Sequence, residues 1–202
     1  YLMVESEAAS GRAVSQPSGF FEEVRLASQL FDGVTRATLS QGEAFHFYRL
    51  GRTIERADAT TRLLDVKYFI LLPGAHFVGT PLDDIQWAAV LRSASAFEMY
   101  RRQFGAIQPR QIIEFLLLDR EFPRSVHHCT IWAEDSMHRI TGSLPGTFGC
   151  LPEQRLGQLN SELNYTTVDD VLHFGVHEYL DEIQKKLNAI DSAVYETFFH
   201  MH

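Results

Sequence analysis

The chain has 202 residues, of which 45% are hydrophobic and 22% are charged. That balance is typical of a soluble globular domain and excludes a disordered tail, a collagen-like fibre and a disulfide scaffold. The longest uninterrupted apolar run, residues 68–72, is far shorter than the roughly 20 residues of a membrane span. The formal net charge of -8 opposes binding to nucleic acid. We therefore expect neither a nucleic acid nor a membrane as partner.

The chain has only two cysteines, Cys129 and Cys150, and neither belongs to a CxxC pair. Two cysteines are too few for a disulfide framework, and the start of the sequence does not have the pattern of a signal peptide. These features favour a reducing cytoplasm. Because the sequence begins at Tyr1 rather than at a methionine, we expect it to be a fragment of a longer protein.

The N-terminal residues 1–19 form a stretch rich in small and polar side chains, which predicts a linker or a poorly ordered lead-in. From Phe20 onwards apolar residues recur at three- and four-residue spacing, and no segment shows strand alternation. Apolar periodicity, capping residues and Pro or Gly boundaries predict seven helices. They cover about 20–34, 40–71, 80–102, 109–118, 123–140, 152–163 and 167–190. The fold class is therefore all-α, a multi-helix antiparallel bundle without a sheet over residues 20–199.

The long predicted helix over 40–71 carries most of the informative charge. Ser40, with Glu43 three residues later, has the spacing of a capping box. At about 100° per residue, one stripe of this helix should face the core. Its members are Leu50, Ile54, Ala57, Thr61 and Leu64. Further apolar residues occupy much of the remaining surface, namely Phe45, Leu63 and Val66. We therefore expect the helix to be packed on two sides.

A helix that is packed on two sides cannot leave all its charges in water, and buried charges must pair. Glu55 and Asp58 are both within reach of arginines one turn away, Arg52 and Arg62. One interpretation is a structural ion network that locks neighbouring helices. Another is a polar pocket inside the bundle that receives a ligand or a partner's peptide, and a third is a solvated face. The acidic-basic cluster 119–121 either caps a turn or completes that pocket.

Several separated segments, in this order, resemble the Alpha-E domain family, an all-helical bacterial family of unknown function. They are GEAFHFYRLGRTIERADATTRLLDVKYFILL, DDIQWAAVLRSASAFEMYRR, EFLLLDREFPRSVHHC and GVHEYLDEIQKKLNAI. Members of that family are usually longer and carry an earlier copy of an arginine-x-x-glutamate-arginine-alanine motif. Here one copy is present, at 52–57. The chain therefore resembles the C-terminal part of a member.

The resemblance implies a partnership more than a reaction. Alpha-E domains occur beside, or fused to, ATP-grasp-type peptide ligase-like proteins and transglutaminase-like proteins. The implied role is an accessory module in a system that forms or remodels amide bonds, with no cofactor of its own. The family's characteristic residues fall on Glu43, Arg49, Arg52, Glu55, Arg56 and Asp58, and our candidate polar site consists of these six and Arg62.

Two other classes of function remain open. A helix-bundle di-metal enzyme would use Glu-x-x-His pairs, and the chain has one such pair in Glu43 and His46. His173 and His177 are four residues apart and could join them as ligands. The other class is a structural dimerisation scaffold, in which the charges only set helix register and the chain forms a homo-oligomer. The sequence has no GxGxxG, Walker or GxSxG motif.

Overall fold

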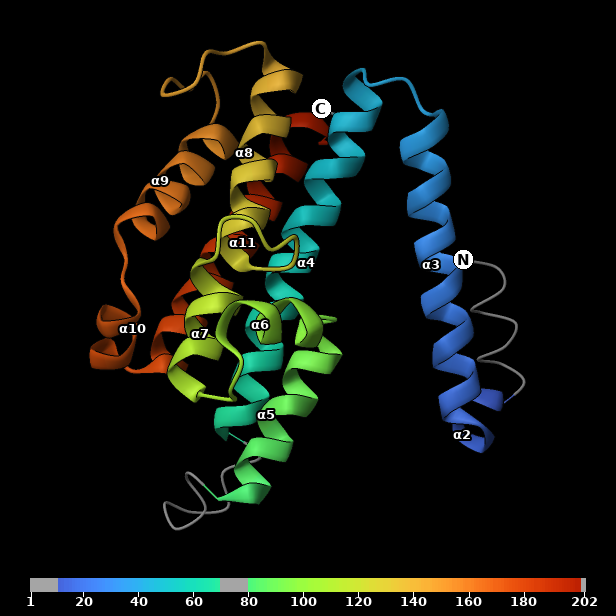
Figure 1. The fold of residues 1–202 in the computed structure, drawn as a ribbon. Coiled ribbons are helices and arrows are strands. Elements are labelled where there is room, and N and C mark those ends of the chain that lie inside the picture. Colours follow the sequence, from blue (N-terminus) through green and yellow to red (C-terminus); the bar gives the residue numbers. More distant parts are fainter. Residues whose placement is uncertain (1–10, 70–79, 201–202) are drawn as a thin grey trace. The chain divides into compact units, whose positions relative to one another are not determined.

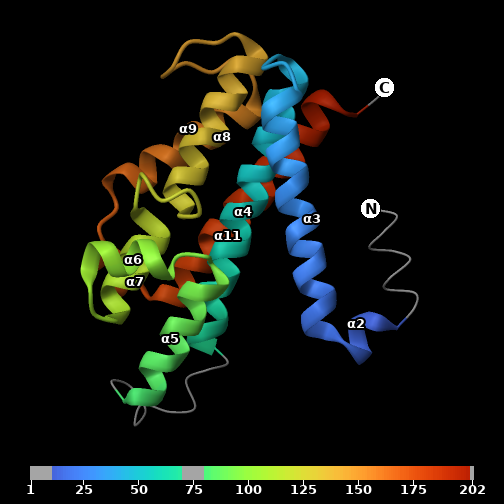
Figure 2. The ribbon, with the colours of Figure 1, turned by 45° about the vertical axis from the view of Figure 1, so that its right-hand side comes forward.

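The computed structural model describes residues 11–69 and 80–200. Within these residues the fold is all-α, as predicted, with ten helices and no strand. The helices are α2 (Arg12–Ser15), α3 (Pro17–Thr38), α4 (Glu43–Phe69), α5 (Pro81–Ser93), α6 (Phe97–Phe104), α7 (Pro109–Leu118), α8 (Val126–Thr141), α9 (Leu151–Tyr165), α10 (Val168–Phe174) and α11 (Val176–Phe198). Figures 1 and 2 show them from two directions.

The chain divides into two units, Tyr1–Phe45 and His46–His202. In the first unit α2 folds back on α3, and the Arg12 guanidinium lies 2.6 Å from the Glu23 carboxylate. Both α2 and the first turn of α3 lie within the stretch that we expected to be a linker. Helix α3 begins at Pro17 because proline is suited to the first turn of a helix, where its missing N–H has no partner to lose.

In the second unit the part of α4 from His46 onwards runs antiparallel to both α8 and α11. Arg49 contacts Ser136, whereas two turns later along α4 Arg56 contacts the carbonyl of Pro123, just before α8. Phe47 contacts Phe198 near the end of α11, with 5.2 Å between the ring centroids. Contacts that advance along α4 thus move backwards along its neighbours, which is the antiparallel arrangement expected from the sequence.

Helix α9 completes this bundle by packing against α8 and α11, and it runs opposite to both (Figure 1). Helices α5, α6 and α7 form a smaller group, and α7 connects it to α8 and α10. The predicted stripe of α4 lies in the core, since Leu50, Ile54, Ala57, Thr61 and Leu64 are all buried. Of the further apolar residues, Phe45 is buried and Leu63 half-buried, but Val66 is exposed, so the helix is less enclosed than we expected.

Two predicted helices are each split in the structure. The helix expected over 80–102 breaks after α5, where Ser95 adopts a left-handed backbone with φ of 53° and the chain turns into α6. The helix expected over 167–190 breaks at Gly175, whose φ of 104° suits glycine alone among the residues. Both breaks interrupt an apolar pattern that continues on each side, and for that reason periodicity did not reveal them.

Two helices also begin at residues other than those that the sequence predicted. Helix α4 begins at Glu43, so Ser40 is not its N-cap residue. Helix α8 begins at Val126 rather than at Pro123, because the Ser125 hydroxyl caps it by accepting the backbone N–H of His128. Helix α10 is capped by Thr167, which forms a reciprocal capping box with Asp170. No helix in the described ranges combines the length and apolarity that crossing a membrane requires.

Candidate functional site

The seven residues of the candidate polar site lie along α4 and do not all face the same surroundings. Glu43, Glu55 and Arg62 are exposed, whereas the other four are half-buried. Those four are Arg49, Arg52, Arg56 and Asp58. The glutamate of the motif is thus among the positions of α4 that face solvent.

Arg49 is the member that joins α4 to another helix. Its Nε donates to the Ser136 hydroxyl at 2.6 Å, and its Nη2 donates to the Asp135 carboxylate. The guanidinium also lies over the Trp132 ring, 4.9 Å from the centroid. Charge-assisted bonds together with a cation–π contact fix this side chain, which is 15% exposed. Arg49 thus holds α4 against α8.

Arg56 lies one heptad after Arg49, on the same flank of α4. Its guanidinium donates to the carbonyl of Pro123 at 3.3 Å. Burial raises the pKa of the neighbouring thiol of Cys129 to about 12, against the opposing charges of Arg56, Arg124 and Arg52. A thiol held neutral in this way does not act as a nucleophile at neutral pH, so the arginines do not activate it.

Asp58 and Arg62 pair with each other on the surface of α4. The Arg62 Nε donates to the Asp58 Oδ2 at 2.6 Å, one helical turn away. This bond raises the pKa of Arg62, an effect to which the charge of Asp58 adds. The pair lies within one helix, and it therefore does not lock α4 to a neighbour.

Glu55 differs from the residues around it. It is exposed and forms no hydrogen bond or ion pair with any residue in 11–69 or 80–200. The segment 119–121 does not reach it either, since the Asp119 carboxylate accepts the backbone N–H groups of Glu121 and Phe122 at 2.8 and 2.7 Å. That carboxylate caps its own turn. The side chain of Glu55 is thus available to another molecule.

The histidines of the metal hypothesis have separate surroundings. His46 is buried on α4, His173 is exposed with its Nδ1 2.7 Å from the Asp169 carbonyl, and the His177 Nδ1 lies 2.6 Å from the Asp65 Oδ1. Across the described part of the chain, no three His, Cys, Asp or Glu side chains are grouped as a metal site requires. Within the second unit, His46, His173 and His177 each have different neighbours.

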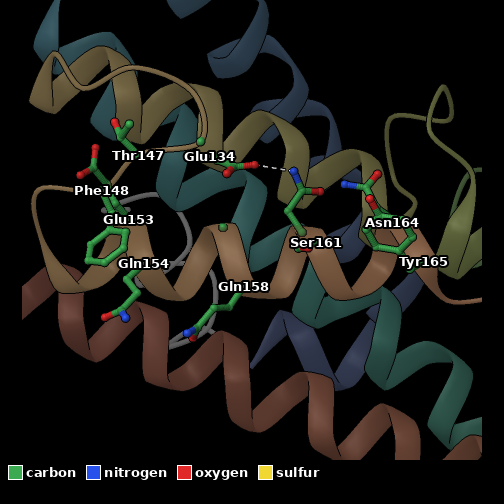
Figure 3. A pocket seen from close by; sticks show the side chains of 12 residues that line it. Glu134, Thr147, Phe148, Glu153, Gln154, Gln158, Ser161, Asn164 and Tyr165 are labelled. Carbon is green, nitrogen blue, oxygen red and sulfur yellow. Dashed lines mark hydrogen bonds between the residues drawn. The ribbon is translucent and has the colours of Figure 1, made fainter.

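A cleft that the sequence did not predict lies between α9 and the loop that connects it to α8 (Figure 3). Its volume is about 580 Å³. It is lined by Glu134 of α8, by Gly146, Thr147 and Phe148 of the loop, and by Glu153, Gln154, Gly157, Gln158, Asn160, Ser161, Asn164 and Tyr165 of α9. One sequence feature could have indicated this cleft. The α9 segment has amide side chains between the leucines of its buried stripe.

Glu153 anchors the loop over this cleft. Its side chain is 0% exposed and accepts bonds from the hydroxyls of Thr141 and Ser143 and from the Gly149 N–H. Burial opposes its ionisation, but the donors, which include the Cys150 N–H, outweigh burial and lower the pKa to about 2. Glu153 is therefore a permanent negative charge at one end of the cleft.

Glu134 is the second carboxylate of the cleft. Its Oε2 accepts a bond from the Asn160 amide nitrogen. Its Oε1 lies 3.8 Å from the His138 Nε2, and the Nδ1 of the same imidazole is 3.5 Å from the Glu153 Oε1. One histidine thus lies between the two carboxylates, behind the lining of the cleft.

The comparisons with known proteins agree with the resemblance. The model of the Alpha-E family, described as "a predicted alpha-helical domain with a conserved ER motif", matches residues 1–199. No curated protein and no solved structure matches the chain. The dipeptide Glu-Arg occurs once in the 202 residues, at Glu55 and Arg56. The motif in the family description therefore corresponds to the exposed carboxylate and the neighbouring anchored guanidinium of α4.

Proposed function

The chain belongs to the Alpha-E family, and from that membership we propose that it is an accessory domain of a peptide-modifying system rather than its catalyst. Its partners are ATP-grasp-type peptide ligase-like and transglutaminase-like proteins, the classes implied by the family resemblance. Its docking point is the motif Glu55 and Arg56 on α4. The compartment is the cytoplasm, a choice supported by two cysteines that are both free.

The observation that carries this proposal is the contrast within the motif. Arg56 is held by the carbonyl of Pro123, whereas Glu55, the adjacent residue, is exposed and without a partner in the described residues. Exposure is ordinary for a surface glutamate, so the weight lies on the position of Glu55 within the Glu-Arg motif of the family description. An exposed carboxylate on a helix that is fixed at Arg49 and Arg56 is suited to bind a cation on another protein at a defined position.

The test is a binding measurement between the purified chain and an ATP-grasp-type ligase-like or transglutaminase-like protein from the same organism. Glu55→Gln should weaken binding about tenfold, the cost of removing one partner of a charged interface pair. The same variant should melt at the temperature of the wild-type chain, since no described residue forms a hydrogen bond or ion pair with Glu55.

The matched control is Glu98→Gln, which removes an exposed charge from α6. It should bind like the wild-type chain. Binding that is equal in Glu55→Gln and Glu98→Gln would contradict the docking point. If neither class of partner binds the wild-type chain, the accessory role is wrong. An unfolded Glu55→Gln would instead assign the residue to the structural network.

A further inference from the structure

The cleft beside α9 has the dimensions of a short peptide. Lining residues extend from Glu153 to Tyr165, twelve positions along one helix, which at 1.5 Å per residue is about 18 Å. An extended peptide of about five residues covers that length. Figure 3 shows Phe148 and Tyr165 at opposite ends of the cleft. Tyr165 is 87% exposed, which leaves its ring open to an occupant of the cleft.

The polar lining consists mainly of groups that pair with peptide bonds. Gln154, Gln158 and Asn164 each carry both a donor and an acceptor. Thr147 and Ser161 add hydroxyls. Such groups can satisfy the N–H and C=O of an extended backbone, which must find partners when the backbone leaves water.

The charge of the cleft is negative. Among the described residues, Glu134 and Glu153 are the only charged side chains that line it, and neither lysine nor arginine contributes. Glu153 cannot be neutralised by an incoming ligand because its oxygens are already bonded inside the protein. Glu134 has only the Asn160 amide as a close donor, so it can accept another. A net charge of -8 on the whole chain adds to the attraction for a cation.

Two buried hydrogen-bond acceptors lie near the lining of the cleft. Asn160 directs its amide nitrogen to Glu134, and its Oδ1 is buried without a partner in the described residues. His127, which is 1% exposed, lies below. Its Nδ1 is 3.2 Å from the Leu118 carbonyl, an acceptor, so the Nδ1 carries the proton and the Nε2 of the neutral ring is an acceptor too.

The Nε2 of His127 is buried and has no hydrogen-bond partner among the residues described. Burial lowers the pKa of this histidine, while the amides of Asn164 and Asn160, both in the cleft lining, act in the opposite direction. These two acceptors are buried and His127 does not line the cleft, so the choice of occupant rests on the charge of Glu134 and on the amides that do line it.

We propose that the cleft between α9 and the α8–α9 loop binds an extended peptide of about five residues that carries a lysine or arginine, with the cation at Glu134 and the peptide groups at the amides of α9. This site is distinct from the docking point at Glu55. On α8, Glu134 faces α9, whereas the next two residues, Asp135 and Ser136, bind Arg49 of α4.

The test is a ¹H–¹⁵N NMR titration of the full chain with the pentapeptide Ala-Ala-Lys-Ala-Ala, acetylated and amidated so that lysine is its one charge. Chemical-shift changes should concentrate in residues 157–165. The lysine peptide should bind about fivefold more tightly than the same peptide with glutamine in place of lysine. Glu134→Gln should abolish that difference, whereas Glu98→Gln should preserve it.

Tyr165→Ala protects the test against misfolding, since so exposed a side chain contributes little to the fold. This substitution should weaken the binding of the lysine peptide and of the glutamine peptide by the same factor. Equal affinity for the lysine and glutamine peptides would overturn the proposal, as would shifts outside the cleft. Butylamine that binds as tightly as the lysine peptide would overturn the assignment to a peptide. Glu55→Gln should leave this titration unchanged, so failure of the docking proposal and failure of the cleft proposal are distinguishable.

Discussion

Lys67 forms an ion pair with Asp83 in the interior of the protein, with 2.6 Å between the Nζ and the Oδ1 and side-chain exposures of 0% and 4%. The ammonium also donates to the Gln86 side-chain oxygen at 2.8 Å and lies 5.3 Å from the centroid of the Trp87 ring. This pair connects the end of α4 to α5. It is the buried charge pairing that we expected of α4, but at residues outside the candidate polar site.

Removing one partner of this pair should be costly. Lys67→Ala leaves Asp83 buried without its cation, and we expect a loss of about 3–5 kcal/mol in the free energy of unfolding. The double variant Lys67→Met with Asp83→Leu removes both charges and should lose much less. Urea denaturation measures the free energy of unfolding of the single and the double variant. Lys185→Ala, which breaks an exposed pair with Asp181 on α11, is the control and should leave stability close to that of the wild-type chain.

Arg49 and Arg62 should differ in their contribution to stability, although both form ion pairs from α4. Arg49→Ala removes bonds to Asp135 and Ser136 on α8 and should cost about 1–2 kcal/mol. Arg62→Ala breaks an exposed pair within one helix and should cost less than about 0.5 kcal/mol. Thermal denaturation of the two variants makes the comparison. Equal losses would show that the contact between α4 and α8 does not depend on Arg49.

Glu153 should make stability depend on pH in the acid range. Its pKa falls from 4.5 to about 2 on folding, so its ionised form stabilises the folded state above pH 4.5, and this contribution is lost as pH falls towards 2. A shift of that size corresponds to about 3 kcal/mol. Glu153→Gln should therefore be less stable than the wild-type chain at pH 7, and the two should converge near pH 2. A difference that stays constant from pH 7 to pH 2 would contradict this prediction.

His177 should show the opposite dependence on pH. Its hydrogen bond to Asp65 is the main cause that raises its pKa above 6.5, and the charges of Asp65, Glu178 and Asp181 act in the same direction. The contribution to stability is thus complete below pH 6.5 and is lost as pH rises through the higher folded pKa. NMR titration of the His177 ring should show this raised pKa, and Asp65→Asn should lower it. A titration unchanged in Asp65→Asn would show that Asp65 is not the cause.

The amino-acid sequence determined the fold class and the buried stripe of α4, because apolar residues at helical spacing must face a common core whatever their neighbours are. It also located the Glu-Arg motif on that helix. It did not determine which charges are buried, since the helical positions of Glu55 and Lys67 reveal nothing about the helix packed beside each. Packing of α5 buries Lys67, whereas no described residue pairs with Glu55.

The cleft depended still more on tertiary structure. Glu134 belongs to α8 and Asn160 to α9, and only the packing of the two helices brings their side chains into contact. The breaks at Ser95 and Gly175 likewise depend on local backbone geometry that apolar periodicity does not encode. Sequence thus established which faces must be buried, and the packing of helices against one another decided which polar groups meet and which remain exposed to a partner.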